Sequence, residues 1–274
     1  MPRVTSFQGK RIFIPDGKTI GDFNIAFENF DGEVTSATDL ATMGWVVTDV
    51  DTSGHSETVV GADSFLRIAS GSKNDAGVEL QLLTPTTATH TQAPHKSIGP
   101  MVSTATLMDN RSMFMFTRIG VMHTVAAWTE KMLFGWVVTD TSVMVPGTGA
   151  PSITTGGGIY YHIGEDADIS ATTQTAAAAA DQTSVGTQGT ASSATVIGDW
   201  VEYGWVAEWT DADAGTGVVR FYIDGELVAT KTDGLPMTST QTYGVTFALL
   251  GGATDQASSM GVDYILTGVS ASGK

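Results

Sequence analysis

The sequence of 274 residues contains no cysteine. This absence excludes disulfide bonds, thiolate metal ligands and cysteine nucleophiles. No stretch approaches the ~20 consecutive apolar residues of a membrane-spanning helix. The N-terminal residues also lack the apolar block of about 7–15 residues that marks a secretory signal. The sequence therefore predicts synthesis in the cytoplasm, or export by a route that the sequence does not show. It also predicts a fold held by packing and hydrogen bonds, in a chain long enough to bury about 75% of its unfolded surface.

Basic residues are scarce. Lysine and arginine together number 13, against 29 aspartates and glutamates, which gives a formal net charge of −16. An acidic body repels phosphate backbones and anionic lipids, and this charge balance argues against nucleic-acid and membrane partners.

The N-terminal segment is an exception to this acidity, because several basic residues fall before position 19, where Asp16 is the single acid. One interpretation is a solvated tail. The other is a docking arm, which the apolar residues among the charges favour, since segments that only solvate a surface usually lack them. We predict an arm over residues 1–22 that docks on a partner through Arg3, Phe7, Lys10, Arg11, Ile12, Phe13 and Ile14.

The rest of the chain has an all-β pattern, with short alternating stretches between clusters of Gly, Asp, Asn and Thr. In the clearest stretch, residues 201–209, the odd positions are apolar or aromatic and the even positions include Glu202, Gly204 and Glu208, so one face should meet a core. Further strands are predicted at residues 44–50, 64–69, 78–83, 101–107, 112–122, 131–138, 157–162, 218–223, 226–230, 243–250 and 262–268. No fixed repeat is present, which favours one β-sandwich over residues 23–274.

Residues 166–198 are biased in composition, rich in Ala, Thr, Ser and Gly and without large side chains. The alanine run could form a helical turn. Its neighbours favour an extended surface loop or insertion, and we predict a low-complexity loop here.

The stretch RFYIDGELVAT, residues 220–230, predicts a β-hairpin with Asp224-Gly225 as a type I′ turn. Such a turn pairs Ile223 with Glu226, Phe221 with Val228 and Val219 with Thr230. Asp224 is then a turn residue at a solvent-exposed tip and not a catalytic group.

These motifs carry a resemblance. FYIDG preceded by DWVEYGWVAEW, with GVDYILTGV near the end, resembles the closing portion of concanavalin A-like (lectin/glucanase, laminin-G-like) jelly-roll domains. Upstream, FLRIASGSKNDAGVELQL, MFMFTRIGV and KMLFGWVVTD resemble earlier strands of versions found in bacteriophage virion proteins. Over residues 23–268 the resemblance implies a jelly-roll β-sandwich of two antiparallel sheets, and it is weakly specific for function.

Catalytic motifs are missing. Glucanases of this superfamily place alternate carboxylates on one strand face, one as nucleophile and one as acid. Glu28, Asp31 and Glu33 do not have that spacing. Glu202 and Glu208 share a face, but ~20 Å of strand separates them, beyond the ~5–9.5 Å that glycosidase carboxylates need. We predict that the protein is not an enzyme.

Metal and cofactor motifs are incomplete as well. Asp49, Asp51 and Ser53 resemble the opening of a calcium loop, yet Val60 stands where the bidentate glutamate is required. An acidic turn explains these residues, so no cofactor is expected and they remain weak calcium candidates. Among the six tryptophans, Trp128 and Trp200 do not fall on a predicted core face, and they are the candidates for a ligand surface.

These observations favour a non-enzymatic viral structural protein, a decoration or cement protein that binds the capsid protein at the surface of a bacteriophage virion. Such a protein is expected to form homo-oligomers, because repeated lattice sites often recruit cyclic oligomers. The alternatives are a phage tail or receptor-binding component, or another lectin-like module that binds a glycan on the concave face of the sandwich. A glycoside hydrolase is a third hypothesis.

Overall fold

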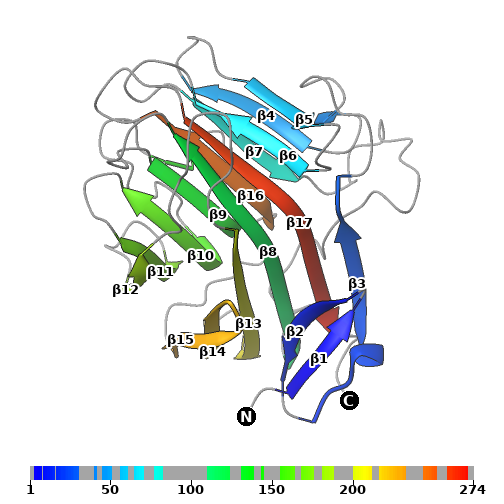
Figure 1. The fold of residues 1–274 in the computed structure, drawn as a ribbon. Coiled ribbons are helices and arrows are strands. Elements are labelled where there is room, and N and C mark those ends of the chain that lie inside the picture. The colour runs from blue at the N-terminus through cyan, green and yellow to red at the C-terminus, as the bar shows by residue number, and fades with distance from the viewer. Residues whose placement is uncertain are drawn as a thin grey trace.

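The computed structural model is a sandwich of two antiparallel β-sheets (Figure 1). It describes residues 3–7, 9–15, 17–30, 40–41, 45–50, 56–60, 65–70, 77–82, 110–123, 131–138, 143–144, 155–163, 168–175, 181–187, 200–211, 216–232, 243–251 and 258–270. A single turn of 3₁₀ helix, η1 (Ile20–Asp22), is the one helix whose two ends both lie within these residues. Within this part of the chain, no helix has the length and apolar character needed to cross a bilayer.

The eight-stranded sheet has the order β15-β14-β13-β8-β17-β6-β5, and β3 also pairs with β17. Its strands are β3 (Phe23–Glu28), β5 (Ser56–Val60), β6 (Phe65–Ala69), β8 (Ser112–His123), β13 (Val201–Asp211), β14 (Thr216–Ile223), β15 (Glu226–Lys231) and β17 (Ser258–Ser270). The seven-stranded sheet has the order β12-β11-β10-β9-β16-β7-β4. Its strands are β4 (Trp45–Val50), β7 (Gly77–Leu82), β9 (Lys131–Val138), β10 (Thr155–Ile163), β11 (Asp168–Thr175), β12 (Asp181–Thr187) and β16 (Tyr243–Leu250).

Most predicted strands are confirmed with bounds that differ by a few residues, while the strand predicted at residues 101–107 lies outside the described residues. The prediction of a loop over residues 166–198 is corrected for residues 168–175 and 181–187, because β11 and β12 form an edge hairpin of the seven-stranded sheet. The other residues of that range lie outside the described part of the chain. β-branched threonines suit a strand, and only Ile169 and Ala171 of this hairpin are fully buried apolar residues. Val185 of β12 packs against the core as well, so three apolar side chains among those described, none of them aromatic, cover this edge.

The main core lies between the sheets. As predicted, the odd-numbered residues of β13 enter it, with Tyr203, Trp205 and Trp209 all buried. Tyr160 of β10 reaches across the sandwich, and its hydroxyl lies 2.8 Å from the carbonyl oxygens of both Gly204 and Tyr222. Burial raises the pKa of Tyr160 well above its ordinary value.

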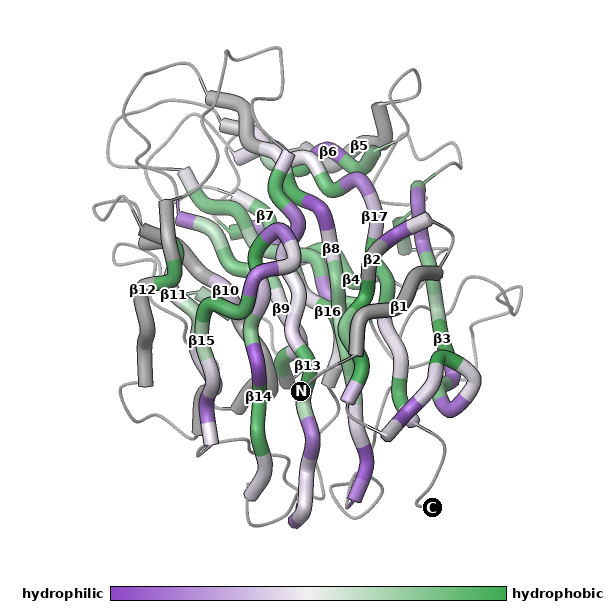
Figure 2. The backbone as a smooth tube through the Cα atoms, turned by 60° about the horizontal axis from the view of Figure 1, so that its bottom comes forward, coloured by the Kyte–Doolittle hydropathy of each residue, from purple (hydrophilic) through white to green (hydrophobic). Residues whose placement is uncertain are grey.

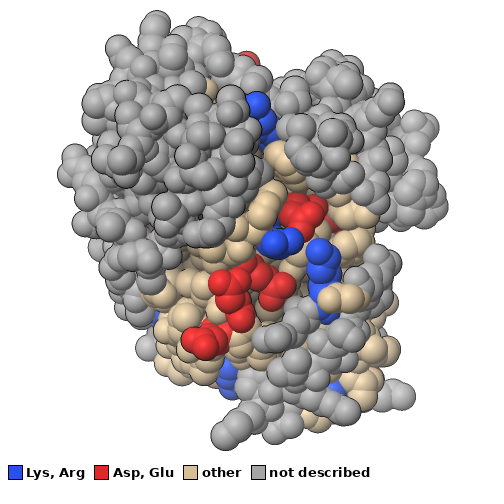
Figure 3. Space-filling model, viewed as in Figure 1, with Lys and Arg blue, Asp and Glu red and all other residues tan. Residues whose placement is uncertain are grey.

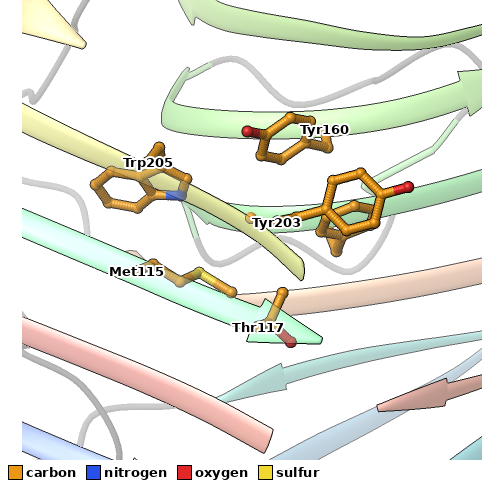
Figure 4. Close-up of a pocket in the computed structure, with 7 residues that line it drawn as sticks. Met115, Thr117, Tyr160, Tyr203 and Trp205 are labelled. Atoms are coloured by element: carbon orange, nitrogen blue, oxygen red, sulfur yellow. The ribbon is translucent and has the colours of Figure 1, made fainter. Parts of the chain in front are cut away.

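Figure 4 shows the interior around this tyrosine. The space there is too small to hold a water molecule, and it is lined by Met115, Thr117, Phe134, Gly135, Tyr160, Tyr203 and Trp205. Close packing fills this part of the core, as in protein interiors generally. The core at this point offers no ligand site.

The predicted turn is present, with φ of 48° at Asp224 and 83° at Gly225. Ile223 pairs with Glu226 as predicted, but Phe221 pairs with Ala229 and not with Val228. This register shift is a β-bulge, which adds one residue to β15 and lets Val228 and Ala229 both pack against the core. The predicted pairing beyond the turn is therefore corrected by one residue.

Asp224 is exposed and structural. Its carboxylate accepts a hydrogen bond of 2.9 Å from the Glu202 amide, and its own amide donates to the Glu202 carbonyl oxygen at 2.8 Å. The aspartate thus connects the turn to the start of β13.

The N-terminal segment folds back on the domain. β1 (Arg3–Phe7) and β2 (Lys10–Ile14) form an antiparallel hairpin, which Figures 1 and 2 both show lying over β8 and β17. Ile12, Phe13 and Ile14 are buried in a second apolar cluster on the outer face of the eight-stranded sheet. Phe13 stacks on Tyr222 with ring centroids 4.2 Å apart.

This packing differs from the predicted extended arm. Its physical reason is the apolar outer face of the eight-stranded sheet, where Phe114, Phe116, Val206 and Leu266 would otherwise face water. The sequence pattern of β13 showed only one apolar face, and it gave no sign that neighbouring strands make the other face apolar too. The three apolar residues of β2 are used within the chain.

Candidate functional site

The polar part of the same outer face begins at a bulge in β17. Along β8, Ile119 pairs with Val262 and the next residue, Arg118, pairs with Tyr264, so Asp263 is the extra residue. A bulge redirects side chains and strengthens the local twist. It brings Asp263 and Tyr264 together beside Arg118.

Two cations share the Asp263 carboxylate. Its Oδ2 lies 3.3 Å from Nη1 of Arg118 and 3.6 Å from Nζ of Lys10, which comes from the hairpin. The Lys10 ammonium also lies over the Tyr264 ring, 4.2 Å from its centroid. One carboxylate is thus shared between two cations. The Arg118 side chain is 42% exposed, which leaves it accessible from solvent.

Glu202 on β13 is held by Tyr264. The phenol donates a hydrogen bond of 2.5 Å to Oε2 of Glu202. Burial raises the pKa of Tyr264 far above its ordinary value, and the bond to Glu202 raises it further, so the phenol stays protonated at neutral pH. Tyr264 therefore acts as a donor that fixes the glutamate.

Trp200 precedes β13 and is half-buried. Its ring meets Phe65 edge to face, with centroids 5.5 Å apart, and the Arg118 guanidinium lies 5.4 Å from the tryptophan centroid. The sequence named Trp200 as a ligand-surface candidate, and the structure places it beside a partly exposed cation. Trp128, the other candidate, lies outside the described residues.

These side chains form one group, which we call the outer cluster: Lys10, Arg118, Trp200, Glu202, Asp263 and Tyr264. Figure 3 shows blue and red side chains interleaved on the described part of this face. The group joins cations, an aromatic ring and hydrogen-bond acceptors. Both carboxylates are engaged by protein donors.

The outer face of the seven-stranded sheet carries another acid, Glu79 on β7, which is 1% exposed. Its Oε1 accepts hydrogen bonds from the amides of Val143 and Met144 at 3.0 and 3.1 Å. These two residues belong to an apolar cluster that packs on this face with residues of β9 and β16. Glu79 therefore anchors a covering segment, and its carboxylate is occupied.

The remaining predicted site residues are scattered. Glu202 and Glu208 have separate partners, since Glu208 forms an ion pair with Arg220. Asp49 is exposed on β4, while Asp51 and Ser53 lie outside the described residues. No group of three or more His, Asp or Glu side chains that could hold a metal ion occurs in the part of the chain that the structure describes. Nothing is described of the side chains of Arg3, Phe7 and Arg11, three of the predicted docking residues.

Sequence reasoning missed Arg118 and Asp263 as site residues. A signal for the bulge exists in the sequence, because the buried positions of β17 change parity from Met260 and Val262 to Ile265 and Val269. Such a change of phase marks an extra residue in a strand. The partners that surround it come from distant segments and required the fold.

Comparisons with known proteins identify the fold. No protein-family model matches the chain, and no curated protein matches its sequence. Among solved structures, the chain is similar to the carbohydrate recognition domain of Emp46p, at 9% identity over 88% of this chain and 94% of that one, with a TM-score of 0.52. It is also similar to an endo-1,3-β-glucanase from Streptomyces sioyaensis, at 15% identity over 94% and 100% of the two chains, with a TM-score of 0.53.

The carbohydrate recognition domain of Emp47p is a further similar structure, at 10% identity over 92% of this chain and 98% of that one, with a TM-score of 0.53. The predicted concanavalin A-like jelly-roll fold is confirmed. One of these three proteins is a glucanase and two are carbohydrate recognition domains. At such low identity the likeness shows the fold alone.

Proposed function

We propose that this chain is a non-enzymatic structural protein of a bacteriophage virion, which decorates the capsid by binding the capsid protein. The observation that carries this proposal is that segments of the chain itself pack on both outer faces of the sandwich. The hairpin lies on the eight-stranded sheet, and residues 143–144 lie on the seven-stranded sheet. A glycosidase needs two carboxylates about 5–9.5 Å apart across a bound sugar. The described acids on these faces are instead engaged by protein groups.

The N-terminal hairpin remains the proposed attachment element, in a revised form. With Ile12, Phe13 and Ile14 buried, attachment depends on what the hairpin presents away from the sheet. In the described part of the chain β1 pairs with β2 alone, so its second backbone edge can add a strand from a partner. Arg3 and Arg11 supply charge that would pair with acidic groups of the capsid protein. The resemblance of the upstream strands to phage virion proteins supports the same assignment.

Co-sedimentation with capsids that lack this protein tests the proposal. Removal of residues 1–18 is a poor variant, because it uncovers the apolar outer face of the eight-stranded sheet. The double charge reversal Arg3→Glu/Arg11→Glu is cleaner, with Glu226→Lys at the exposed start of β15 as a charge-changing control. We expect the wild-type chain and the control to pellet with capsids, the double variant to remain in solution, and binding to weaken with salt.

Two results would count against the proposal. If the wild-type chain fails to pellet, capsid decoration is rejected. If the double variant binds as the wild type does, the hairpin is not the attachment element. Sedimentation velocity of the free protein tests the proposed homo-oligomer, and mass spectrometry of purified particles tests the virion location.

A carbohydrate-binding module, in a tail or receptor-binding component or elsewhere, is the second candidate. The observation that favours it is the half-buried Trp200 beside the exposed Arg118, since carbohydrate sites combine aromatic rings with a few polar groups. The Emp46p and Emp47p neighbours are carbohydrate recognition domains. A glycan array probed with the wild-type chain and Trp200→Ala tests it: binding should fall in the variant, and an array without any binding would reject it.

A further inference from the structure

We propose that the outer cluster is a binding site for a sugar that carries a carboxylate, of the uronic-acid or sialic-acid class. This inference rests on the carbohydrate-binding candidate, and it names the ligand class and the residues. Arg118 and Lys10 hold the sugar carboxylate, Trp200 packs against the C–H face of the ring, and Glu202 and Asp263 accept hydrogen bonds from hydroxyls.

The N–H donors of the two cations in the cluster favour an anionic ligand. An arginine has five N–H donors and a lysine three, and a single carboxylate does not occupy them all. The Asp263 side chain is 26% exposed and Lys10 is 29% exposed, so the shared ion pair lies within reach of solvent. Arg67 on β6 adds a third cation: it pairs with Gly261, two residues before Asp263, and its Nε donates to Ser259.

Lys10, Arg67 and Arg118 bring three cations to this part of the outer face, beside the carboxylates of Glu202 and Asp263 and with Asp224 next to Glu202. The chain as a whole has a formal net charge of −16, which repels an acidic sugar from most of its surface. These cations are the groups of the patch that can hold a sugar carboxylate. The hairpin contributes Lys10, so the site is complete only when the hairpin is packed on the sheet.

The aromatic ring distinguishes a sugar from other anions. Phe65, which is 6% exposed, contacts the Trp200 ring edge to face and fixes its orientation. The Arg118 guanidinium lies over the Trp200 ring, 5.4 Å from its centroid, so a pyranose stacked on the indole would lie beside this cation. An acidic peptide has carboxylates but no flat C–H face to stack on the indole.

The acceptors complete the match. The Glu202 carboxylate is fixed by the Tyr264 phenol through Oε2, which leaves lone pairs for further donors. Sugar hydroxyls are such donors, and hydrogen bonds to charged groups are about twice as strong as neutral ones. A neutral sugar can use the indole and the acceptors, but it leaves the cations without a ligand.

Isothermal titration of the full chain with matched pairs of sugars tests the proposal. Trigalacturonic acid is compared with galactotriose, and 3′-sialyllactose with lactose. We expect at least one acidic member to bind at least ~10-fold more tightly than its neutral partner, a difference of about 1.4 kcal/mol. Arg118→Met and Trp200→Ala should each weaken acidic-sugar binding at least tenfold. Arg220→Met, which removes an arginine paired with Glu208 on the same face, should bind as the wild type does.

Several results would overturn the proposal. If the chain binds neutral and acidic sugars equally, with loss in Trp200→Ala, it is a carbohydrate-binding module but the acidic-sugar site is rejected. If no sugar binds, both ideas fail. Oligoglutamate binding as tightly as the sugars, without dependence on Trp200, would indicate charge attraction alone.

Unchanged binding in a folded Arg118→Met variant, judged by its circular dichroism and melting temperature, would also reject the site. If that variant is destabilised, Lys10→Met provides the same test from the hairpin. Retained acidic-sugar affinity in Lys10→Met would then reject the proposed pair of cations.

Discussion

Replacement of Phe13 by alanine tests whether the N-terminal hairpin is part of the folded domain. The Phe13 side chain is 8% exposed. Its ring stacks on Tyr222 with centroids 4.2 Å apart and on Phe116 with centroids 6.1 Å apart. Removal of a buried phenylalanine side chain costs about 3–5 kcal/mol. We expect a loss near the lower end, about 3 kcal/mol, because the hairpin lies at the surface and can close part of the cavity.

Urea unfolding followed by tryptophan fluorescence measures this loss as a change in the free energy of unfolding. A loss of this size is a large part of the roughly 5–15 kcal/mol that a domain of ordinary stability has. Phe13→Leu is the matched control, since it keeps most of the apolar contact and should cost about half as much. A Phe13→Ala variant within ~0.5 kcal/mol of the wild type, the usual range for surface substitutions, would show that the hairpin does not pack on the sheet.

Three further predictions concern buried groups. Burial raises the pKa of Tyr222 to about 12, whereas an unfolded phenol ionises near pH 10. The free energy of unfolding should therefore fall as the pH rises from about 9 to 12. An absorbance titration at 295 nm, compared with that of Tyr222→Phe, would contradict this if Tyr222 ionised near pH 10 in the folded chain. Glu79→Gln keeps the shape of the acceptor but loses its charge, and one carboxamide oxygen replaces the carboxylate that accepts from Val143. We expect chemical denaturation to show a decrease of about 1–3 kcal/mol in the free energy of unfolding. An unchanged denaturation midpoint would argue that residues 143–144 are not anchored there. In Gly204→Ala the new Cβ would lie 2.0 Å from an atom of the Phe116 ring. Overpacking should therefore lower the free energy of unfolding by about 1–3 kcal/mol or more. A melting temperature equal to that of the wild type would refute the close approach.

Local patterns predicted most of the fold. Alternation identified β13 and its core face, and Asp224-Gly225 identified a turn whose residues both have positive φ. These features depend on residues close together in the sequence. The β-bulge in β15 was missed, because it depends on how Val228 and Ala229 meet the opposite sheet.

Features that depend on distant segments could not be predicted. The hairpin packs on the domain because five strands, β3, β8, β13, β14 and β17, contribute apolar residues to one outer face. Taken by itself, β13 presents mainly charged residues and a glycine there, with Val206 as its apolar contribution. The edge strand β11 was missed because its core positions hold only Ile169 and Ala171, too few for an apolar pattern. The outer cluster combines residues from positions 10 to 264, and Trp200 was its one member chosen as a possible ligand contact from the sequence.

The most direct test of the proposed function is the saturation of binding to capsids that lack this protein. A decoration protein occupies equivalent sites on a lattice, so we predict that pelleted protein rises to a plateau at a fixed ratio to capsid protein. The Arg3→Glu/Arg11→Glu variant should not reach that plateau, whereas Glu226→Lys should. No pelleting of the wild-type chain, or uptake that rises without a plateau, would contradict capsid decoration.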